Sequence, residues 1–445
     1  MKISVIGTGY VGLVSGVCLA EKGHDVVCVD SDQRKVDSIC KGVPPIFERG
    51  LEPLLRKHIG SKLQATTDLR RAVLDSELSL IAVGTPFSGT EIDLRFIKEV
   101  SRQIGEALRD KNSYHVVVVK STVIPGTTDS VVILAIEEAS GKRAGADFGL
   151  GMNPEFLTEG EAVDDFMHPD RIVLGGIDDR TISILDRLYA GFESVDKLRT
   201  NCKTAEMIKY ASNALLATMI SFSNEIANLG STLGGIDSVD VMRGVHLSNY
   251  LSLTLPDGTR KGPAILSFLA AGCGFGGSCL PKDVKALVAQ GRKIGLPMNL
   301  LDAVIQINEH QPERVLGLLK KHFPSLEGVR VSVLGLSFRP DTNDMRESPA
   351  IPLLRALSKQ GAQLKAYDPA AAEEARRLFN GDSVDICDDL AAAISDAQAV
   401  ILVTRWDEFK KVPELLRKLE QPTLFIDGRR MLDKHDFAMY DGIGL

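Results

Sequence analysis

The chain has 445 residues, which is too many for one ordinary hydrophobic core and indicates two or three domains. Hydrophobic residues make up 44% of the chain and charged residues 25%, as in ordinary globular proteins. The formal charge of −7 argues against nucleic acid or an anionic membrane as a partner. No apolar run approaches the roughly 20 residues that cross a bilayer, so no membrane partner is expected.

The cysteine and histidine content points away from disulfides and metals. The seven cysteines are odd in number and form no CxxC pair, which predicts a reducing, cytoplasmic location without a disulfide framework. The eight histidines are scattered singly, without the spacing that zinc sites show, so no metal is expected.

The first third of the chain alternates β-branched runs with amphipathic stretches such as residues 93–110. This alternation predicts βαβ units and a parallel sheet. The predicted strands are residues 2–7, 25–30, 78–86, 114–122, 148–152 and 171–176.

The segment GTGYVG lies between the first predicted strand and a helix, with Gly7, Gly9 and Gly12 in the G-x-G-x-x-G pattern. Its glycines allow a tight turn and bring a pyrophosphate close to backbone N–H groups at a helix N-terminus. Asp30 ends the second strand, eighteen residues after Gly12, where a carboxylate accepts hydrogen bonds from ribose hydroxyls. The carboxylate would repel a 2′-phosphate, which predicts NAD rather than NADP, although Arg34 and Lys35 nearby weaken that preference. The alternative is a glycine-rich turn without a ligand.

Two further turns, GTP at 84–86 and KST at 120–122, follow apolar strands at the edge where doubly wound sheets bind ligands. Ordinary turn chemistry explains each of them equally well when it is taken alone.

The residue pattern changes near residue 200, from alternating strand and helix signals to helical periodicity alone. Residues 203–233 predict one long helix, and more helices follow to about residue 322, interrupted by a loop at Ser248–Pro263. A second α/β block begins near Val329. We therefore predict an α/β fold with two Rossmann-like doubly wound domains, joined by a long central helix and a helical middle domain. The predicted domains are 1–200, 201–322 and 323–445.

The segment GFGGSCLPKD places Cys279 in a bare loop just before a predicted helix with Pro281 in its first turn. A helix N-terminus stabilises negative charge, so the pKa of this thiol should be lowered, and Lys282 adds positive charge. Cys279 is thus a candidate nucleophile, and an inert buried cysteine is the alternative.

Other polar residues can serve the same chemistry. Glu155 and Glu159 follow the strand at 148–152, and Lys209 and Asn213 share a face of the long helix. The alternative for Lys209 is a surface lysine whose stem packs on the helix. A nicotinamide cofactor and a nucleophilic cysteine together suggest two hydride removals, through a thiohemiacetal and a thioester that water then cleaves.

Eight motifs occur in a familiar order: GTGYVG, VGTP, KSTVIPGT, NPEFLTEG, AEMIKYASNALLA, GFGGSCLPKD, GLSFRPDTNDMRESP and FIDGRR. Over nearly the whole chain they resemble the UDP-glucose/GDP-mannose dehydrogenase family. The resemblance implies oxidation of the C6 alcohol of a nucleotide sugar to a carboxylate, with two NAD per turnover. The expected reaction converts UDP-glucose to UDP-glucuronate, and HPDRIVLGG favours it over GDP-mannose. GDP-mannose and a UDP-N-acetylhexosamine are the alternative substrates.

The resemblance also implies what each domain and catalytic residue does. Residues 1–200 would bind NAD, 201–322 would carry the cysteine loop and form a homodimer or larger assembly, and 323–445 would bind the UDP-sugar. Cys279 would be the nucleophile, Glu155 the acid/base for thioester hydrolysis, and Lys209 the oxyanion stabiliser. The implied groups that hold substrate, place water or assist proton transfer are Asn213, Asp283 and Thr122.

Binding residues are implied by the same motif matches. The cofactor contacts are Gly7, Gly9, Tyr10, Val11, Gly12, Asp30, Lys35, Thr85, Thr122, Glu159 and Arg346. The substrate contacts are Glu155, Phe156, Leu157, Lys209, Asn213, Arg260, Phe275, Gly276, Phe338, Arg339 and Arg429. Arg260 lies in the Ser248–Pro263 segment. This segment is longer than the corresponding segment expected in the family's commonest UDP-glucose enzymes.

Two different functions remain as alternatives. A two-electron dehydrogenase of the 6-phosphogluconate type would share the glycine turn and the long helix but would not need Cys279. A non-catalytic sugar-nucleotide-binding protein would keep the fold, but it would not need the full set of Cys279, Lys209, Asn213, Glu155 and Asp283.

Overall fold

The β-branched runs of the first third lie in one eight-stranded sheet, in a computed structural model that describes all 445 residues. The strand order is β3-β2-β1-β4-β5-β6-β7-β8, parallel from β3 to β6, antiparallel between β6 and β7, and parallel between β7 and β8. The first six strands thus have the 3-2-1-4-5-6 order of dinucleotide-binding domains. The strands are β1 (Lys2–Ile6), β2 (Asp25–Val29), β3 (Leu63–Thr66), β4 (Leu78–Ile81), β5 (His115–Val119), β6 (Phe148–Met152), β7 (Arg171–Gly176) and β8 (Asp196–Thr200).

A second, six-stranded sheet repeats this order in the last third of the chain. Its strands run β13-β12-β11-β14-β15-β16, and every pair is parallel. They are β11 (Arg330–Leu334), β12 (Gln363–Tyr367), β13 (Val384–Ile386), β14 (Ala399–Leu402), β15 (Leu424–Asp427) and β16 (Met439–Gly442). The predicted fold class, with two Rossmann-like sheets and a helical middle, is confirmed.

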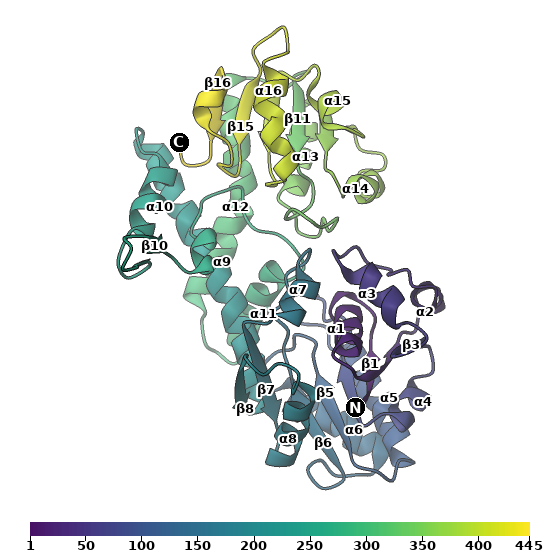
Figure 1. Cartoon of the computed structure of the whole chain (residues 1–445). Coiled ribbons are helices and arrows are strands. Elements are labelled where there is room, and N and C mark those ends of the chain that lie inside the picture. Colours follow the sequence, from purple (N-terminus) through teal and green to yellow (C-terminus); the bar gives the residue numbers. More distant parts are fainter. The chain divides into compact units, whose positions relative to one another are not determined.

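The chain divides into two units, Met1–Ser212 and Asn213–Leu445, and the division falls inside the long helix α9 (Cys202–Leu233) (Figure 1). The helices of the first unit are α1 (Tyr10–Glu21), α2 (Gln33–Cys40), α3 (Leu51–His58), α4 (Leu69–Asp75), α5 (Arg95–Arg109), η1 (Thr128–Val132), α6 (Ile133–Ser140), α7 (Ala162–Met167) and α8 (Asp179–Leu188). The second unit adds α10 (Ser238–His246), η2 (Ala264–Phe268), α11 (Leu280–Lys293), α12 (Asn299–His322), α13 (Ala350–Lys359), α14 (Ala372–Leu378), α15 (Leu390–Ile394), η3 (Asp407–Lys411), α16 (Val412–Leu416) and η4 (Lys434–Asp436). None of the helices combines the length and apolar character that crossing a bilayer requires.

Helices cover both faces of the first sheet, so its central strands are buried on both sides. All five residues of β5 are buried. Val116 and Val118 belong to one apolar cluster, and Val117 and Val119 belong to another. Because successive side chains of a strand point to opposite faces, these clusters are the two cores above and below the sheet.

The two sheets use the same glycine turn after their first strand. Gly7 follows β1 with φ 100°, and Gly335 follows β11 with φ 89°. A Cβ on Gly7 would lie 2.5 Å from the carbonyl oxygen of Ala82, and one on Gly335 would lie 2.6 Å from the amide nitrogen of Thr404. Only glycine satisfies both the left-handed backbone and the close approach of the neighbouring chain.

The segment Ser248–Pro263, predicted as a loop, holds a small antiparallel hairpin. Its strands are β9 (Leu253–Thr254) and β10 (Arg260–Lys261), and their four residues are exposed.

Candidate active site

The glycine turn opens helix α1, whose N-cap is Gly9 and whose first turn has no side-chain cap. A Cβ on Gly12 would strike the carbonyl oxygen of Gly7, whereas a Cβ on Gly9 would meet nothing within 4 Å. Gly12 is therefore required by packing, and Gly9 leaves open space beside uncapped amides. That arrangement fits a pyrophosphate, as the predicted NAD site requires.

Asp30 lies just after β2 and is bonded to the same turn. Its Oδ2 accepts hydrogen bonds from the Thr8 amide at 2.9 Å and the Thr8 hydroxyl at 2.6 Å, and its Oδ1 accepts one from the Asp32 amide at 3.0 Å. The Lys35 ammonium lies 3.6 Å away. Burial raises the pKa of Asp30, but these bonds and Lys35 outweigh burial and hold the pKa below its ordinary value.

Tyr10, an expected cofactor contact, is bonded through its hydroxyl to the carboxylate of Glu48. Glu48 also accepts hydrogen bonds from the amides of Gly160 at 2.8 Å and Ala162 at 3.0 Å, at the start of α7. Sequence reasoning missed Glu48, because it lies in an irregular segment between α2 and α3. Val11 packs against the core beneath the first sheet.

The carboxyl ends of β4 and β5 are joined by two residues that the motifs predict. The Thr85 hydroxyl donates a hydrogen bond to the carbonyl oxygen of Thr122 at 2.7 Å. The structure thus brings the GTP and KST turns together at the ligand-binding edge of the sheet.

Glu155 and Lys209 form a buried ion pair in the first unit. Their charged atoms are 2.9 Å apart, and the side chains are 6% and 5% exposed. Glu155 Oε2 also accepts a hydrogen bond from the Leu157 amide at 2.6 Å. Burial raises the pKa of Glu155, but the charge of Lys209 and these hydrogen bonds outweigh it and lower the pKa below its ordinary value. The alternative of an exposed surface lysine at position 209 is wrong.

The residues next to Glu155 have ordinary packing partners. The Phe156 ring lies 3.9 Å from the guanidinium carbon of Arg171 and 5.6 Å from the Lys209 ammonium. Leu157 packs against the core, and Glu159 is buried.

Cys279 is the N-cap residue of α11 in the second unit, and Pro281 lies in the first turn, as the sequence predicts. Cys279 is half-buried, whereas Cys28 and Cys273 are buried, and burial raises the pKa of Cys28 to about 12. None of the seven cysteines forms a disulfide. Cys279 therefore combines partial access with a helix N-terminus, the setting that favours a reactive thiolate.

Asp283, one turn into α11, is almost fully buried and has two charged or polar partners. Its Oδ2 accepts a hydrogen bond from the Asn213 amide at 2.6 Å, and its Oδ1 lies 2.5 Å from the Lys282 ammonium. Asp283 is thus more than a charge at a helix start, because it connects α11 to α9.

The loop before Cys279 is rich in glycine because other chain segments pack against it. A Cβ on Gly277 would lie 2.7 Å from the Phe338 ring, and one on Gly276 would strike the carbonyl oxygen of Glu347. The Gly277 amide also donates a hydrogen bond to the carbonyl oxygen of Arg346 at 2.8 Å. Phe275, Gly276 and Phe338, all expected at the substrate, are therefore neighbours.

Polar side chains hold this loop from three directions. Asn308 on α12 accepts a hydrogen bond from the Phe275 amide at 2.8 Å and donates one to its carbonyl oxygen at 3.0 Å. Arg429 donates to the Gly274 carbonyl oxygen at 2.8 Å, and Gln311 donates to that of Gly272 at 2.7 Å. Sequence reasoning missed Asn308 and Gln311, although amides in an otherwise amphipathic helix were an available signal.

The remaining predicted arginines lie on the second unit. Arg346 forms an ion pair with Asp344 at 2.6 Å, and Arg260 donates a hydrogen bond to the carbonyl oxygen of Leu247 within the hairpin region. Arg339 is half-buried in the turn after Phe338.

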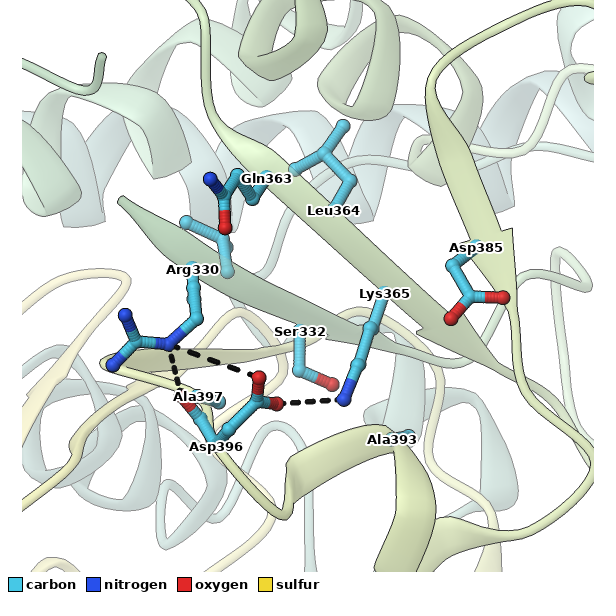
Figure 2. Close-up of a pocket in the computed structure, with 10 residues that line it drawn as sticks. Arg330, Ser332, Gln363, Leu364, Lys365, Asp385, Ala393, Asp396 and Ala397 are labelled. Carbon is cyan, nitrogen blue, oxygen red and sulfur yellow. Dashed lines mark hydrogen bonds and ion pairs between the residues drawn. The ribbon is translucent and has the colours of Figure 1, made fainter. Parts of the chain in front are cut away.

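A cavity of about 210 Å³ lies at the amino ends of β11 and β12, lined by Ser332, Lys365 and Asp396 among others (Figure 2). The Lys365 ammonium is 2.6 Å from the Asp396 carboxylate, so these two charges of the cavity lining neutralise each other. Parallel sheets bind ligands at the opposite, carboxyl edge, so this cavity is not the candidate nucleotide site. No group of three metal-binding side chains is arranged to hold a metal ion.

Residues 1–193 match the NAD binding domain of the UDP-glucose/GDP-mannose dehydrogenase family, 203–310 match its central domain, and 332–434 match its UDP binding domain. The chain belongs to this family. It is therefore an NAD-dependent oxidoreductase that acts on a nucleotide sugar.

Three similar proteins show how far the relationship extends. UDP-glucose 6-dehydrogenase AglM of Haloferax volcanii is 42% identical over 448 residues, covering 100% of both chains. GDP-mannose 6-dehydrogenase of Pseudomonas aeruginosa is 40% identical over 83% of this chain and 81% of its own. The solved UDP-glucose dehydrogenase of Pyrobaculum islandicum is 37% identical, with a TM-score of 0.90 over 99% of this chain and 97% of its own.

Proposed function

We propose that the protein oxidises UDP-glucose to UDP-glucuronate and reduces two NAD⁺ for each sugar. The observation that carries this proposal is Cys279, half-buried as the N-cap of α11, one turn before the bonded pair of Asp283 and Asn213. A two-electron dehydrogenase needs no nucleophile, so this thiol favours the four-electron reaction. Similarity to UDP-glucose 6-dehydrogenases along the whole chain supports the substrate.

Each proposed step has a residue to carry it. Loss of one hydride and one proton converts the C6 alcohol to an aldehyde, and the Cys279 thiolate adds to it, forming a thiohemiacetal when the new oxyanion takes up a proton. Loss of a second hydride and proton gives a thioester, and each of the two hydrides would go to a separate NAD⁺. Lys209 stabilises the oxyanion, and Glu155 serves as acid/base while water cleaves the thioester and frees the thiol.

The positions of the remaining groups agree with supporting roles. Asn213 and Asp283 are joined by a hydrogen bond and would hold substrate or water. Thr122 lies at the carboxyl end of β5 and would help to place that water. The remaining cofactor and substrate contacts expected from the motifs are part of the same proposal.

A GDP-mannose 6-dehydrogenase is nearly as similar to the chain, so GDP-mannose is the second candidate substrate. The exposed β9–β10 hairpin lies in the segment that departs from the family's commonest UDP-glucose enzymes. This departure is a second reason to test sugars other than UDP-glucose.

The test is to mix the purified protein with NAD⁺ and single UDP- or GDP-sugars and to count NADH per sugar consumed. Two NADH with UDP-glucose support the proposal, and two NADH only with another sugar change the substrate but keep the chemistry. One NADH per sugar, or full turnover by Cys279→Ala, would refute the four-electron mechanism.

We also propose that the protein is a homodimer that pairs through helix α9. Leu215, Phe222, Leu229 and Leu233 are spaced by seven, seven and four residues, so they lie on one face of the helix. Each is between 47% and 66% exposed, which is costly for a stripe of large apolar side chains in water. A second copy of the same face is the self-complementary partner that a two-fold dimer supplies.

The three predicted domains, 1–200, 201–322 and 323–445, are likewise proposed as functional divisions. The family matches at 1–193, 203–310 and 332–434 support this division.

A further inference from the structure

Lys120 is a buried cation that the proposed mechanism does not use. It follows β5 directly, and only 3% of its surface is exposed. Its ammonium donates a hydrogen bond to Asn153 Oδ1 at 2.9 Å and lies 3.5 Å from the carbonyl oxygen of Asn153. A buried ammonium held by neutral oxygens is expensive, so its presence calls for a physical reason.

The electrostatic surroundings of Lys120 contain two residues of the proposed mechanism. The pKa of Lys120 is lowered to about 8, mainly by burial and also by the charge of Lys209, while the charge of Glu155 acts in the opposite direction. The same interaction acts in reverse, because the charge of Lys120 lowers the pKa of Glu155. The three side chains are therefore coupled, with one negative and two positive charges in a buried place.

Asn153 connects Lys120 to the turn that carries Glu155. Its Oδ1 accepts hydrogen bonds from both Lys120 and the Tyr189 hydroxyl, and its Nδ2 donates to the carbonyl oxygen of Val173 at 2.9 Å. Only Pro154 separates Asn153 from Glu155. The Asn153 side chain thus anchors the chain where it leaves β6 toward Glu155.

We propose that Lys120 is a positioning residue for Glu155: its ammonium fixes Asn153, two residues before Glu155, and its charge stabilises the Glu155 carboxylate. The groups that face Lys120 are Glu155 after β6, Lys209 on α9, the Phe166 ring on α7 and Tyr189 after α8. This inference rests on the proposed acid/base role of Glu155.

Tyr189 provides a matched control, because it donates to the same oxygen of Asn153 but carries no charge. Lys120→Met removes a hydrogen bond and a charge, whereas Tyr189→Phe removes a hydrogen bond alone. We expect the Glu155 carboxylate to titrate about 0.5–1 pH unit higher in Lys120→Met than in the wild type. In Tyr189→Phe its midpoint should stay where it is.

The titration is read without turnover, by infrared spectroscopy of protein labelled with ¹³C at the glutamate carboxyl groups. The Glu155 band is assigned by its loss in Glu155→Gln. The acid limb of the kcat/KM profile should move upward in parallel in Lys120→Met. Equal midpoints in all variants, or equal shifts in Lys120→Met and Tyr189→Phe, would overturn the charge role.

A further pair of variants covers misfolding. If Lys120→Met does not fold, Lys120→Gln provides the neutral side chain, and Lys120→Arg retains the charge with a different shape. Lys120→Arg should keep the Glu155 midpoint while lowering kcat at least severalfold, and a shifted midpoint would contradict the proposal. If the wild type makes no NADH with any nucleotide sugar, the proposed function fails, while the infrared titration still decides whether Lys120 controls Glu155.

Discussion

Replacing Lys209 by methionine should show how much the buried ion pair with Glu155 stabilises the first unit. At 2.9 Å and an effective dielectric constant of about 20, two unit charges attract by about 6 kcal/mol. Much of that attraction offsets the cost of burying both groups, so removing one partner is expected to cost about 3–5 kcal/mol. Lys120 remains coupled to Glu155, which places Lys209→Met toward the lower end of that range.

The sign of the pH dependence follows from the same pair. In the wild type the pKa of Glu155 is lowered, so its stabilising contribution is present above the unfolded-state pKa and is lost as the pH falls through the folded-state pKa. Without Lys209, burial dominates and raises the pKa of Glu155. The cost of Lys209→Met should therefore be largest near pH 8 and should shrink as the pH falls and the carboxyl group becomes protonated.

Hydrogen exchange measured by mass spectrometry is the appropriate assay, because a chain of two compact units is not expected to unfold in one step. Protection of β6 would be compared at several pH values in the wild type, Lys209→Met, Glu155→Gln and the double variant. We expect the double variant to recover at least 1 kcal/mol relative to the sum of the single changes. Additive effects, or a cost of Lys209→Met that does not vary with pH, would refute the reasoning.

Three more predictions test other parts of the structure. Asp30→Asn should lower the preference for NAD over NADP by about tenfold, because it removes the charge that repels a 2′-phosphate; an unchanged ratio of kcat/KM values would contradict this. Asn308→Ala should slow alkylation of Cys279 and lower kcat, since it removes two hydrogen bonds from the cysteine loop, and an unchanged iodoacetamide rate would contradict that role. Phe222→Glu should dissociate the proposed dimer in light-scattering measurements, whereas Phe96→Glu, at an exposed position on α5, should leave the molar mass unchanged.

Most strands that the sequence predicted contain runs of apolar, often β-branched residues, and the missed strands β8 and β13 lack such runs. β5 reads HVVVV and is buried throughout, so its pattern identifies it without tertiary information. β8 reads DKLRT and lies at an edge of the sheet, and β13 has three residues, so neither produces a recognisable period. These strands form because a neighbouring strand offers them hydrogen bonds, which no local pattern records.

The candidate site likewise contains residues that a local pattern predicts and pairings that only the fold shows. The sequence indicated Cys279 at a helix start, because a glycine loop followed by proline is a local signal. Pairing of Lys209 with Glu155, and of Asn213 with Asp283, joins residues more than fifty positions apart and becomes visible only in the fold. Asn308 could have been noticed as an amide in an amphipathic helix, but its partner is the backbone of Phe275, which the sequence does not identify.

Each of the two Rossmann-like sheets has a glycine turn after its first strand. The hydrogen bonds around each turn indicate which sheet binds a dinucleotide. Asp368 follows β12 as Asp30 follows β2, and each accepts hydrogen bonds from the loop after the first strand of its sheet. Asp368 is almost completely buried, and its Oδ2 also accepts a hydrogen bond from the Trp406 indole at 3.1 Å.

The other oxygen of Asp368 accepts hydrogen bonds from the amides of Ala370 and Ala371, both at 2.9 Å. Its acceptor capacity is therefore used within the protein, and it has no surface to offer a ribose hydroxyl. Asp30 has fewer partners, and its side chain is 11% exposed beside the open space at Gly9. The same residue type thus fixes a turn in the second sheet, whereas in the first sheet it keeps the exposure that the proposed ribose contact requires, which agrees with an NAD binding domain at 1–193 and a UDP binding domain at 332–434.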